Sequence, residues 1–157
     1  AGILKRAARH KGSAFVEIYQ NCNIFNDGAF KSFSDKKVRD DRTIVLEHGK
    51  PMVFGKESDK GIRLEGLKPV VTDLAGEADE AGLLVHDEKT PDPTLANLLA
   101  RLEEADESTP VPVGVFRAIE KPTYDGMLDE QVAEARQKPG AGDMDALLAG
   151  GETWVVD

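Results

Sequence analysis

Cys22 is the only cysteine of this 157-residue chain, and its thiol is the group best suited to redox or metal chemistry. A lone free cysteine most often serves as a small buried hydrophobic residue. As a nucleophile it would need a neighbouring base, and as a metal ligand it would need partner ligands that no second cysteine supplies. The residues alone favour the structural interpretation and leave the other two open.

The three histidines, His10, His48 and His86, are the other candidates for acid–base or metal chemistry. Their wide spacing matches no metal-binding pattern, in which two ligands stand a few residues apart. His48 and His86 also lie at apparent turns or strand ends. We therefore expect each histidine to be a surface or turn residue. No complete active site is visible among the residues of the chain.

The run of residues 14–19 is the element that would position Cys22. It is apolar on both faces apart from Glu17, which is typical of a central strand in a parallel sheet. Ligands of such sheets bind beyond the carboxyl ends of the strands, where Cys22 lies. Residues 2–10 predict a helix that packs on this strand. This helix and strand predict the end of an α/β domain, so we expect a carboxyl-terminal portion of a longer polypeptide.

The rest of the chain predicts a mixture of short strands and helices. Residues 43–47 and 52–54 predict a hairpin around a turn at 48–51, and a second pair is predicted at 61–64 and 68–74. Asp92 and Pro93 predict the cap and first position of a helix. The other expected elements are a strand at 83–86, a strand at 113–119, a helix at 127–137 with Leu128, Val132 and Ala135 inward, a short helix capped by Asp143, and a strand at 154–156.

Composition and charge exclude several classes of protein. An apolar content of 40% and a charged content of 31% are typical of a globular domain, and no segment has the length and apolarity of a membrane helix. The net charge of -9 argues against a general nucleic-acid binder. A single cysteine cannot form an internal disulfide, which indicates a reducing, cytoplasmic setting.

The charge is divided unevenly along the chain. Residues 1–63 contain 13 Lys and Arg against 8 Asp and Glu, whereas residues 64–157 contain 7 against 21. A basic amino-terminal part could receive an acidic partner, and an ordinary solvated surface explains it equally well.

Four segments of the chain resemble the β subunit of the 2-oxoacid:ferredoxin oxidoreductases, in particular the 2-oxoglutarate type. They follow one another in the family's order and cover most of the chain. The segments are HKGSAFVEIYQNCNIFNDGAF at 10–30, LEHGKPMVFG at 46–55, KGIRLEG at 60–66 and PVPVGVFRAIEKPTYD at 110–125.

The resemblance implies an α/β fold. Residues 1–28 would be the last helix and strand of a parallel sheet in a thiamine-diphosphate-binding domain, and residues 29–157 a mixed α+β carboxyl-terminal extension. The family's Gly-Asp-Gly…Asn motif, which binds Mg²⁺ and thiamine diphosphate, and three of its four cluster cysteines have no counterpart in this sequence. Cys22, in the context Gln20-Asn21-Cys22, is implied to be the fourth ligand of a 4Fe–4S cluster.

The implied activity is the oxidative decarboxylation of 2-oxoglutarate to succinyl-CoA, with electrons passed to ferredoxin. The implied partners are an α subunit, ferredoxin, coenzyme A and the 2-oxoacid. The basic part could receive ferredoxin or the phosphates of coenzyme A. Two alternatives stay open: a relative of the same family that acts on pyruvate or a branched-chain 2-oxoacid, and a non-catalytic domain that only joins subunits.

Overall fold

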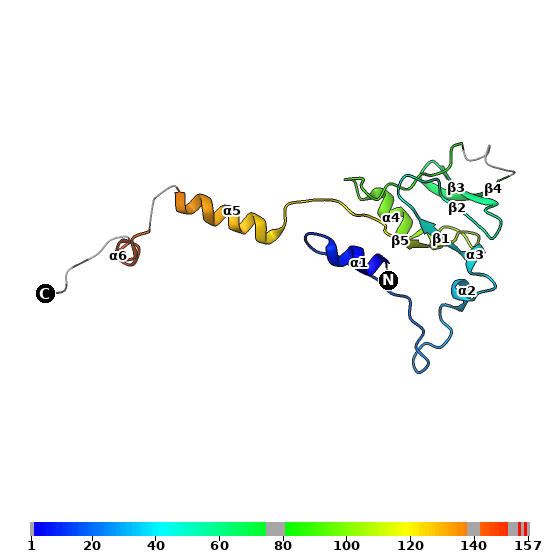
Figure 1. Cartoon of the computed structure of the whole chain (residues 1–157), viewed down its shortest axis with the longest axis horizontal. Helices are drawn as coiled ribbons and strands as arrows, with labels where there is room; N and C mark the ends of the chain where they lie inside the picture. The colour runs from blue at the N-terminus through cyan, green and yellow to red at the C-terminus, as the bar shows by residue number, and fades with distance from the viewer. Residues whose placement is uncertain (1, 75–80, 138–141, 151–153, 155, 157) are drawn as a thin grey trace. The chain divides into compact units, whose positions relative to one another are not determined.

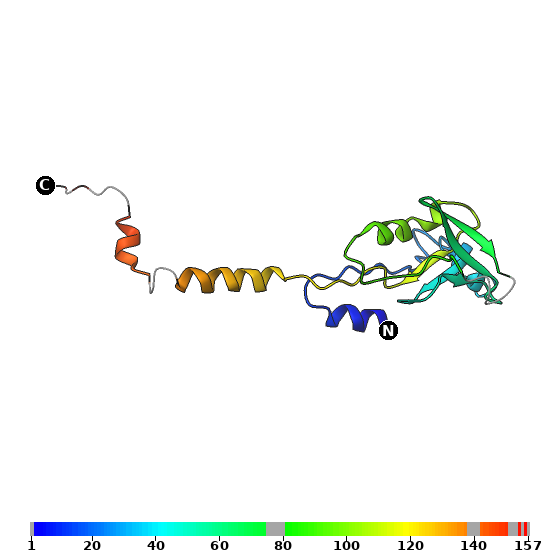
Figure 2. The same cartoon turned by 90° about the horizontal axis from the view of Figure 1, so that it is seen from above.

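The structure, a computed structural model, describes residues 2–74, 81–137, 142–150, 154 and 156. The chain divides into two compact units (Figure 1, Figure 2). Unit 1 comprises Ala1–Arg9 and Ala14–Ile119, and unit 2 comprises His10–Ser13 and Glu120–Asp157. The expected mixture of helices and short strands is confirmed.

Unit 1 contains a parallel sheet of two strands, drawn from distant parts of the chain. β1 (Thr43–Leu46) pairs in parallel with β5 (Val111–Gly114), so that Thr43 lies opposite Val111. The prediction of a hairpin between residues 43–47 and 52–54 is therefore wrong. The turn signals at 48–51 are real, but the backbone groups of β1 pair with β5 instead of the segment that follows the turn.

A second sheet in unit 1 has three antiparallel strands. β2 (Val53–Phe54) pairs with β3 (Lys60–Glu65), which pairs with β4 (Lys68–Asp73). The predicted β3–β4 hairpin is confirmed, with Glu65 opposite Lys68 at its closed end. Gly66 has a φ of 65° in this turn, a conformation that glycine adopts without steric cost.

β5 occupies residues 111–114, earlier than the expected strand at 113–119. Pro112 lies within this strand, opposite Ile44. Proline is tolerated in an edge strand because one side of that strand needs no amide donor. Gly114 has a φ of 139°, and an added Cβ would lie 3.0 Å from the carbonyl oxygen of Leu46, so the two strands approach closely there.

The helices of unit 1 are short. They are α1 (Gly2–Arg9), α2 (Lys31–Ser34), α3 (Arg39–Arg42), α4 (Thr94–Ala100) and the 3₁₀ helix η2 (Leu102–Glu104). The predicted helix after Asp92 is confirmed as α4, although it begins one residue later than expected. The side chain of Asp92 accepts a hydrogen bond from the Thr94 amide at 2.7 Å, and Pro93 occupies the cap position.

The core of unit 1 joins the two sheets to α4 and η2. Its buried side chains are Ile44, Leu46, Met52, Phe54, Ile62, Leu99 and Leu102. The segment at 83–86 connects this core to the sheets through an isolated bridge between Pro51 and Val85 and through the Leu84 amide, which donates to Ile62 at 2.7 Å. The predicted strand at 83–86 is thus an extended segment with a single bridge.

No described side chain of residues 2–30 belongs to that core. Helix α1 is confirmed, but none of its residues is buried, so the expected packing on the following strand is wrong for this structure. Residues 14–21 belong to no strand of the described chain, and Phe15 is 90% exposed. A β-strand forms backbone hydrogen bonds with a neighbouring strand, and residues 14–21 have no such strand beside them in the described part of the chain.

Unit 2 contains two helices, α5 (Tyr124–Gln137) and α6 (Met144–Leu148). Asp143 caps α6 as predicted, because its Oδ1 accepts hydrogen bonds from the amides of Asp145 and Ala146. The expected inward face of α5 is wrong, since no residue of α5 is buried. Trp154 and Val156 lie outside any helix or strand, and the rest of the strand predicted there falls outside the described residues.

Among the described residues, no helix has the length and apolarity to cross a bilayer.

Candidate functional site

Cys22 lies in a tight loop, residues 20–28, that we call the Cys22 loop. The Asn26 amide donates to the Cys22 carbonyl at 2.9 Å, and the two residues form an isolated antiparallel bridge. This hydrogen bond closes a turn of five residues, 22–26, and holds the backbone amides inside the turn near Cys22. The sulfur belongs to a half-buried free cysteine.

The side chain of Asn21 closes the Cys22 loop at its base. Its Nδ2 donates to the Oδ1 atoms of Asn23 at 2.7 Å and Asp27 at 2.9 Å, while its own Oδ1 accepts from the Gly28 amide at 2.8 Å. Asparagine suits such a position because one planar group donates and accepts at once. The residues that flank Cys22 thus have a structural role in shaping the loop.

Three aromatic side chains brace the two ends of the Cys22 loop. The ring of Tyr19 lies 5.1 Å from that of Phe30 and 5.2 Å from that of Phe33, between ring centroids, with tilted and edge-on contacts. Phe30 and Phe33 lie 5.8 Å apart. Burial, together with the charges of Glu17 and Glu103, raises the pKa of the Tyr19 phenol. The cluster fixes the strand-like segment before Cys22 to helix α2 after it.

The electrostatic environment of Cys22 favours a thiolate. The backbone amides of Phe25 and Ile24 lower the pKa of the Cys22 thiol, with a smaller effect of the same sign from Asn26, while partial burial opposes them. A thiolate can attack an electrophile or bind a metal. The groups that act on this pKa are amides, so no histidine base activates the sulfur.

The structure gives Cys22 no partner ligands. Across the described ranges of the chain, no group of three or more His, Cys, Asp or Glu side chains could hold a metal ion. The described chain therefore offers one thiol whose pKa is lowered by its own backbone amides, and the other ligands of a metal would have to come from elsewhere.

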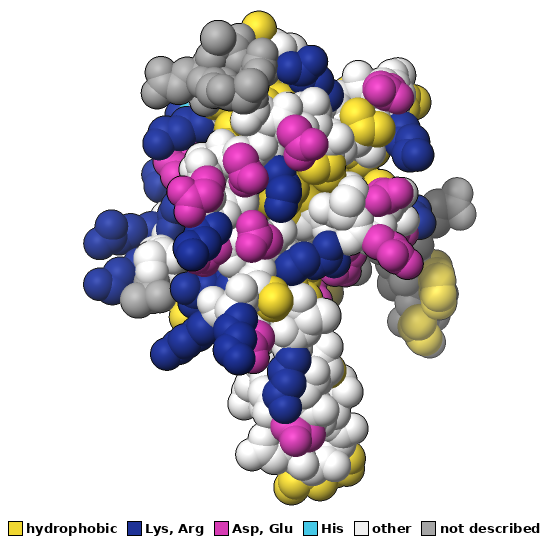
Figure 3. Space-filling model, turned by 90° about the vertical axis from the view of Figure 1, so that its right-hand side faces the viewer, with side chains coloured by type: hydrophobic (Ala, Val, Ile, Leu, Met, Phe, Trp, Pro, Cys, Tyr) yellow, Lys and Arg dark blue, Asp and Glu magenta, His cyan; other side chains and the backbone are white. Residues whose placement is uncertain are grey.

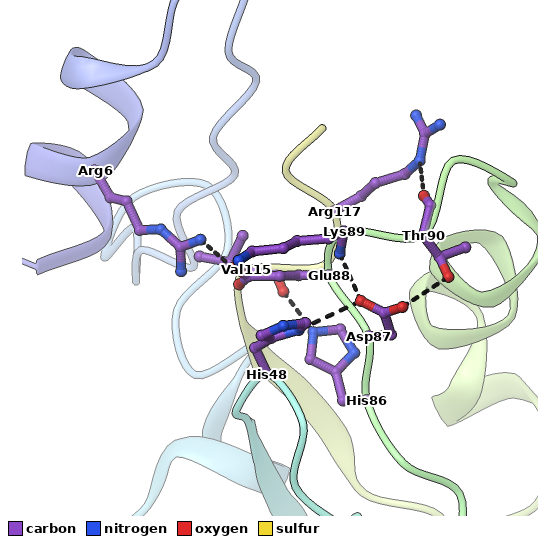
Figure 4. A network of polar contacts seen from close by, with 9 residues as sticks. All are labelled: Arg6, His48, His86, Asp87, Glu88, Lys89, Thr90, Val115 and Arg117. Atoms are coloured by element: carbon purple, nitrogen blue, oxygen red, sulfur yellow. Dashed lines mark hydrogen bonds and ion pairs between the residues drawn. The ribbon is translucent and has the colours of Figure 1, made fainter. Parts of the chain in front are cut away.

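A second polar cluster joins residues that no sequence pattern connects (Figure 4). We call it the His86 network, and it consists of Arg6, His48, His86, Asp87 and Glu88. Arg6 of α1 donates to Glu88, which lies 82 positions later in the chain. His48 Nδ1 lies 3.3 Å from Asp87 Oδ1. Sequence reasoning missed this network because its members are separated by long stretches of chain.

His86 directly precedes Asp87 in the chain, and the prediction that it is a surface or turn residue is wrong. Its side chain is fully buried, and its Nε2 lies 2.8 Å from the carbonyl oxygen of Val115. A carbonyl only accepts, so Nε2 carries the proton. The other ring nitrogen, Nδ1, is buried and has no hydrogen-bond partner among the described residues. His48, by contrast, stands in a turn as predicted.

The pKa values of both carboxylates of the His86 network are lowered. The Lys89 amide and the Thr90 hydroxyl lower the pKa of Asp87, with a further contribution from the two histidines. The hydrogen bond from Arg6 lowers the pKa of Glu88 despite burial of that carboxylate. Arg117 Nε donates to the Thr90 carbonyl at 3.2 Å and its guanidinium also contacts Pro91. This arrangement fastens the segment after β4 to α1 and to the segment after β5.

Comparison with known proteins shows a similarity that the site alone does not reveal. No protein-family profile matches the chain, and no solved structure was found to match it. A curated protein of Mycobacterium tuberculosis, 2-oxoglutarate oxidoreductase subunit KorB, is 38% identical over 157 aligned positions. The resemblance seen in the sequence is confirmed. The alignment covers 99% of this chain and 41% of KorB, so the chain spans less than half the length of this relative.

The name of KorB makes that relative a subunit of a 2-oxoglutarate oxidoreductase. The aligned region includes both Cys22 and the His86 network, since it covers nearly the whole chain. The thiamine-diphosphate domain expected for residues 1–28 has no support from a solved structure. Cofactors and partners of this chain therefore belong to the proposal that follows.

Proposed function

We propose that this chain is part of the β subunit of a 2-oxoacid:ferredoxin oxidoreductase that depends on thiamine diphosphate and an iron–sulfur cluster. The reaction is the oxidative decarboxylation of 2-oxoglutarate to succinyl-CoA, with electrons delivered to ferredoxin. The observation that carries the proposal is the 38% identity to KorB over 99% of the chain. The proposed partners are an α subunit, ferredoxin and coenzyme A, and the proposed location is the cytoplasm.

The Cys22 loop fits the role of one cluster ligand. Amides of Ile24 and Phe25 stabilise negative charge on the sulfur, as a thiolate bound to iron requires. A 4Fe–4S cluster, when bound, carries electrons one at a time. Three of the four thiolates would come from outside these 157 residues, because Cys22 is the only cysteine here. Tyr19, Phe30 and Phe33 would hold the ligand loop in place.

Thiamine diphosphate and Mg²⁺ do not fit the residues present. The sequence lacks the Gly-Asp-Gly…Asn motif that binds them in this family, and no metal-binding group occurs in the described part of the chain. Their site would lie in the remaining length of the subunit. Residues 14–19 would be the last strand of that domain, and their uncovered apolar side chains, with Phe15 90% and Ile18 66% exposed, are what such a strand leaves when its neighbours are missing.

The test is iron content in the intact protein that contains this chain. We expect Cys22→Ser to lose most of the iron and acid-labile sulfide and most 2-oxoglutarate-dependent ferredoxin reduction. Ile24→Ala, at a side chain that is 84% exposed in the same loop, is the control and should keep both. Unchanged iron in Cys22→Ser would contradict the ligand role. Rates with pyruvate and a branched-chain 2-oxoacid distinguish the substrate alternatives.

A second candidate, a domain that only joins subunits, is favoured by the exposed apolar residues of unit 2. Trp154 is 82%, Leu148 78% and Leu147 73% exposed. For this candidate, Cys22→Ser would leave iron and activity unchanged. Deletion of residues 120–157 would instead reduce the amount of companion subunit that copurifies.

A further inference from the structure

The side chain of Asn21 joins the two ends of the Cys22 loop. Its Nδ2 lies 2.9 Å from Asp27 Oδ1, and its Oδ1 lies 2.8 Å from the amide nitrogen of Gly28. These partners come six and seven positions later in the chain, so the contacts run from the residue before Cys22 to the residues beyond the turn. The third contact of Asn21, to Asn23 at 2.7 Å, stays within the loop.

The Asn21 contacts enclose a second, inner closure of the loop. The amide of Asn26 donates to the carbonyl oxygen of Cys22 at 2.9 Å, and the amides of Ile24 and Phe25 lie within this inner turn. Those two amides act on the sulfur of Cys22, so they lie close to it. Without the Asn21 side chain, the direction of these amides would depend on the inner closure.

The Cys22 loop has few charged groups of its own. Residues 20–28 contain one carboxylate, Asp27, and no Lys or Arg. Figure 3 shows the lowest segment of this face, where the loop lies in Figure 1, as mostly uncharged atoms with apolar side chains at its tip. The loop's own electrostatic action on the sulfur therefore comes from backbone amides and from Asp27, and Asn21 helps to place both.

The side chains of Asn21, Asn23 and Asp27 are exposed. Water competes for their hydrogen bonds, so each bond adds little to the free energy of unfolding. The contacts of Asn21 therefore bear on the geometry of the loop more than on the stability of the protein. This distinction separates a positioning role from a merely structural one.

We infer that Asn21 is a positioning residue for the cluster ligand Cys22. Its side chain orients residues 20–28 so that the amides of Ile24 and Phe25 face the sulfur, which raises the reduction potential of the bound cluster. Amide donors stabilise the added negative charge of a reduced cluster, and hydrogen bonds to the sulfurs are among the factors that set this potential. The inference rests on the proposed function, since it requires that Cys22 binds iron.

The first experiment is a redox titration of the cluster in the intact protein, followed by electron paramagnetic resonance. Asn21→Ala and Asn23→Ala are a matched pair, because they remove the same side chain one position before and one position after Cys22. Asn23→Ala leaves the contacts of Asn21 with Asp27 and Gly28 in place. At a fixed solution potential, the ratio of reduced to oxidised cluster should fall about threefold or more in Asn21→Ala. It should stay at the wild-type ratio in Asn23→Ala.

The second experiment measures amide hydrogen exchange in the same loaded proteins. The amides of Ile24, Phe25 and Asn26 should exchange faster in Asn21→Ala than in Asn23→Ala, while the free energy of unfolding stays equal in the two variants. A lower potential without faster exchange would overturn the inference, because Asn21 would then not act through the amides. An unfolding free energy that falls only in Asn21→Ala, with unchanged potential, would reduce Asn21 to a structural residue and overturn it too.

The iron content of Cys22→Ser distinguishes failure of this inference from failure of the proposed function. Iron retained in Cys22→Ser overturns both. Iron lost from Cys22→Ser, with equal potentials and equal exchange in Asn21→Ala and Asn23→Ala, overturns this inference alone. If Asn21→Ala does not retain iron, Asn21→Asp takes its place, since it keeps an oxygen that accepts from the Gly28 amide. Only exchange is then compared, because the added charge itself affects the potential.

Discussion

His86 Nε2 lies 2.8 Å from the carbonyl oxygen of Val115, and this bond connects the segment after β4 to the segment after β5 inside the protein. The imidazole is fully buried and Val115 is half-buried, so the bond is partly withdrawn from water. A buried carbonyl that loses its hydrogen-bond donor destabilises the folded state, because it has left water and gained no other partner.

Replacement of His86 by leucine should therefore destabilise unit 1. We expect the free energy of unfolding to fall by about 1–3 kcal/mol, because the Val115 carbonyl is left without a donor. Urea unfolding followed by circular dichroism measures this. His48→Leu, at a half-exposed turn position, should change the free energy by less than about 0.5 kcal/mol. Equal losses of unfolding free energy in the two variants would show that the buried hydrogen bond does not contribute the expected stability.

The Arg6–Glu88 pair should make stability depend on acid pH. Arg6 lowers the folded-state pKa of Glu88, so the pair stabilises the protein above the unfolded pKa of about 4.3. That contribution is lost as the pH falls through the lower folded pKa. Arg6→Met should cost about 1 kcal/mol at pH 7, a modest figure because the guanidinium is half exposed and screened.

The measurement for this pair is the free energy of unfolding from pH 7 down to pH 3. The difference between wild type and Arg6→Met should shrink towards the acid end. Arg9→Met removes another guanidinium from α1 and is the matched control. A difference that stays constant over this range would show that Arg6 acts by packing and not through the charge of Glu88.

The thiol of Cys22 should react at lower pH than an ordinary cysteine. Amides of Phe25 and Ile24 lower its pKa, so in protein freed of iron the rate of alkylation by iodoacetamide should reach half its maximum at a lower pH than for an unperturbed cysteine. The same chain unfolded in urea should show the ordinary midpoint. Phe25→Pro removes one amide donor and should move the folded midpoint upward. Coincident folded and unfolded profiles would contradict the role of the amides.

The aromatic cluster should control the order of the Cys22 loop. Phe33→Ala removes ring contacts with both Tyr19 and Phe30, each worth about 0.5–1.5 kcal/mol. We expect faster hydrogen exchange of the amides in residues 20–28, including the Asn26 amide that bonds to Cys22. Phe25→Ala, which removes a ring that is 90% exposed, should leave this exchange unchanged. Identical amide hydrogen-exchange rates in the Phe33 and Phe25 variants would show that the aromatic cluster does not control the order of the Cys22 loop.

Elements with local causes could be predicted from the sequence. The β3–β4 hairpin is set by a two-residue turn with Gly66, α6 by the cap at Asp143, and α5 by the helical spacing of its apolar residues. Each depends on contacts between residues a few positions apart. The resemblance to an oxidoreductase subunit and the choice of Cys22 also came from the sequence alone, because they depend on residue identities and their order.

The tertiary structure decided the contacts that cross long stretches of chain. Parallel pairing of β1 with β5, burial of His86 and the Arg6–Glu88 pair join distant residues, and no local pattern encodes which distant group will be the partner. The apolar runs at 14–19 and along α5 show the converse. Their patterns predict burial, yet burial needs a second surface, and within the described chain these side chains stay exposed because the sequence of one segment cannot supply its own cover.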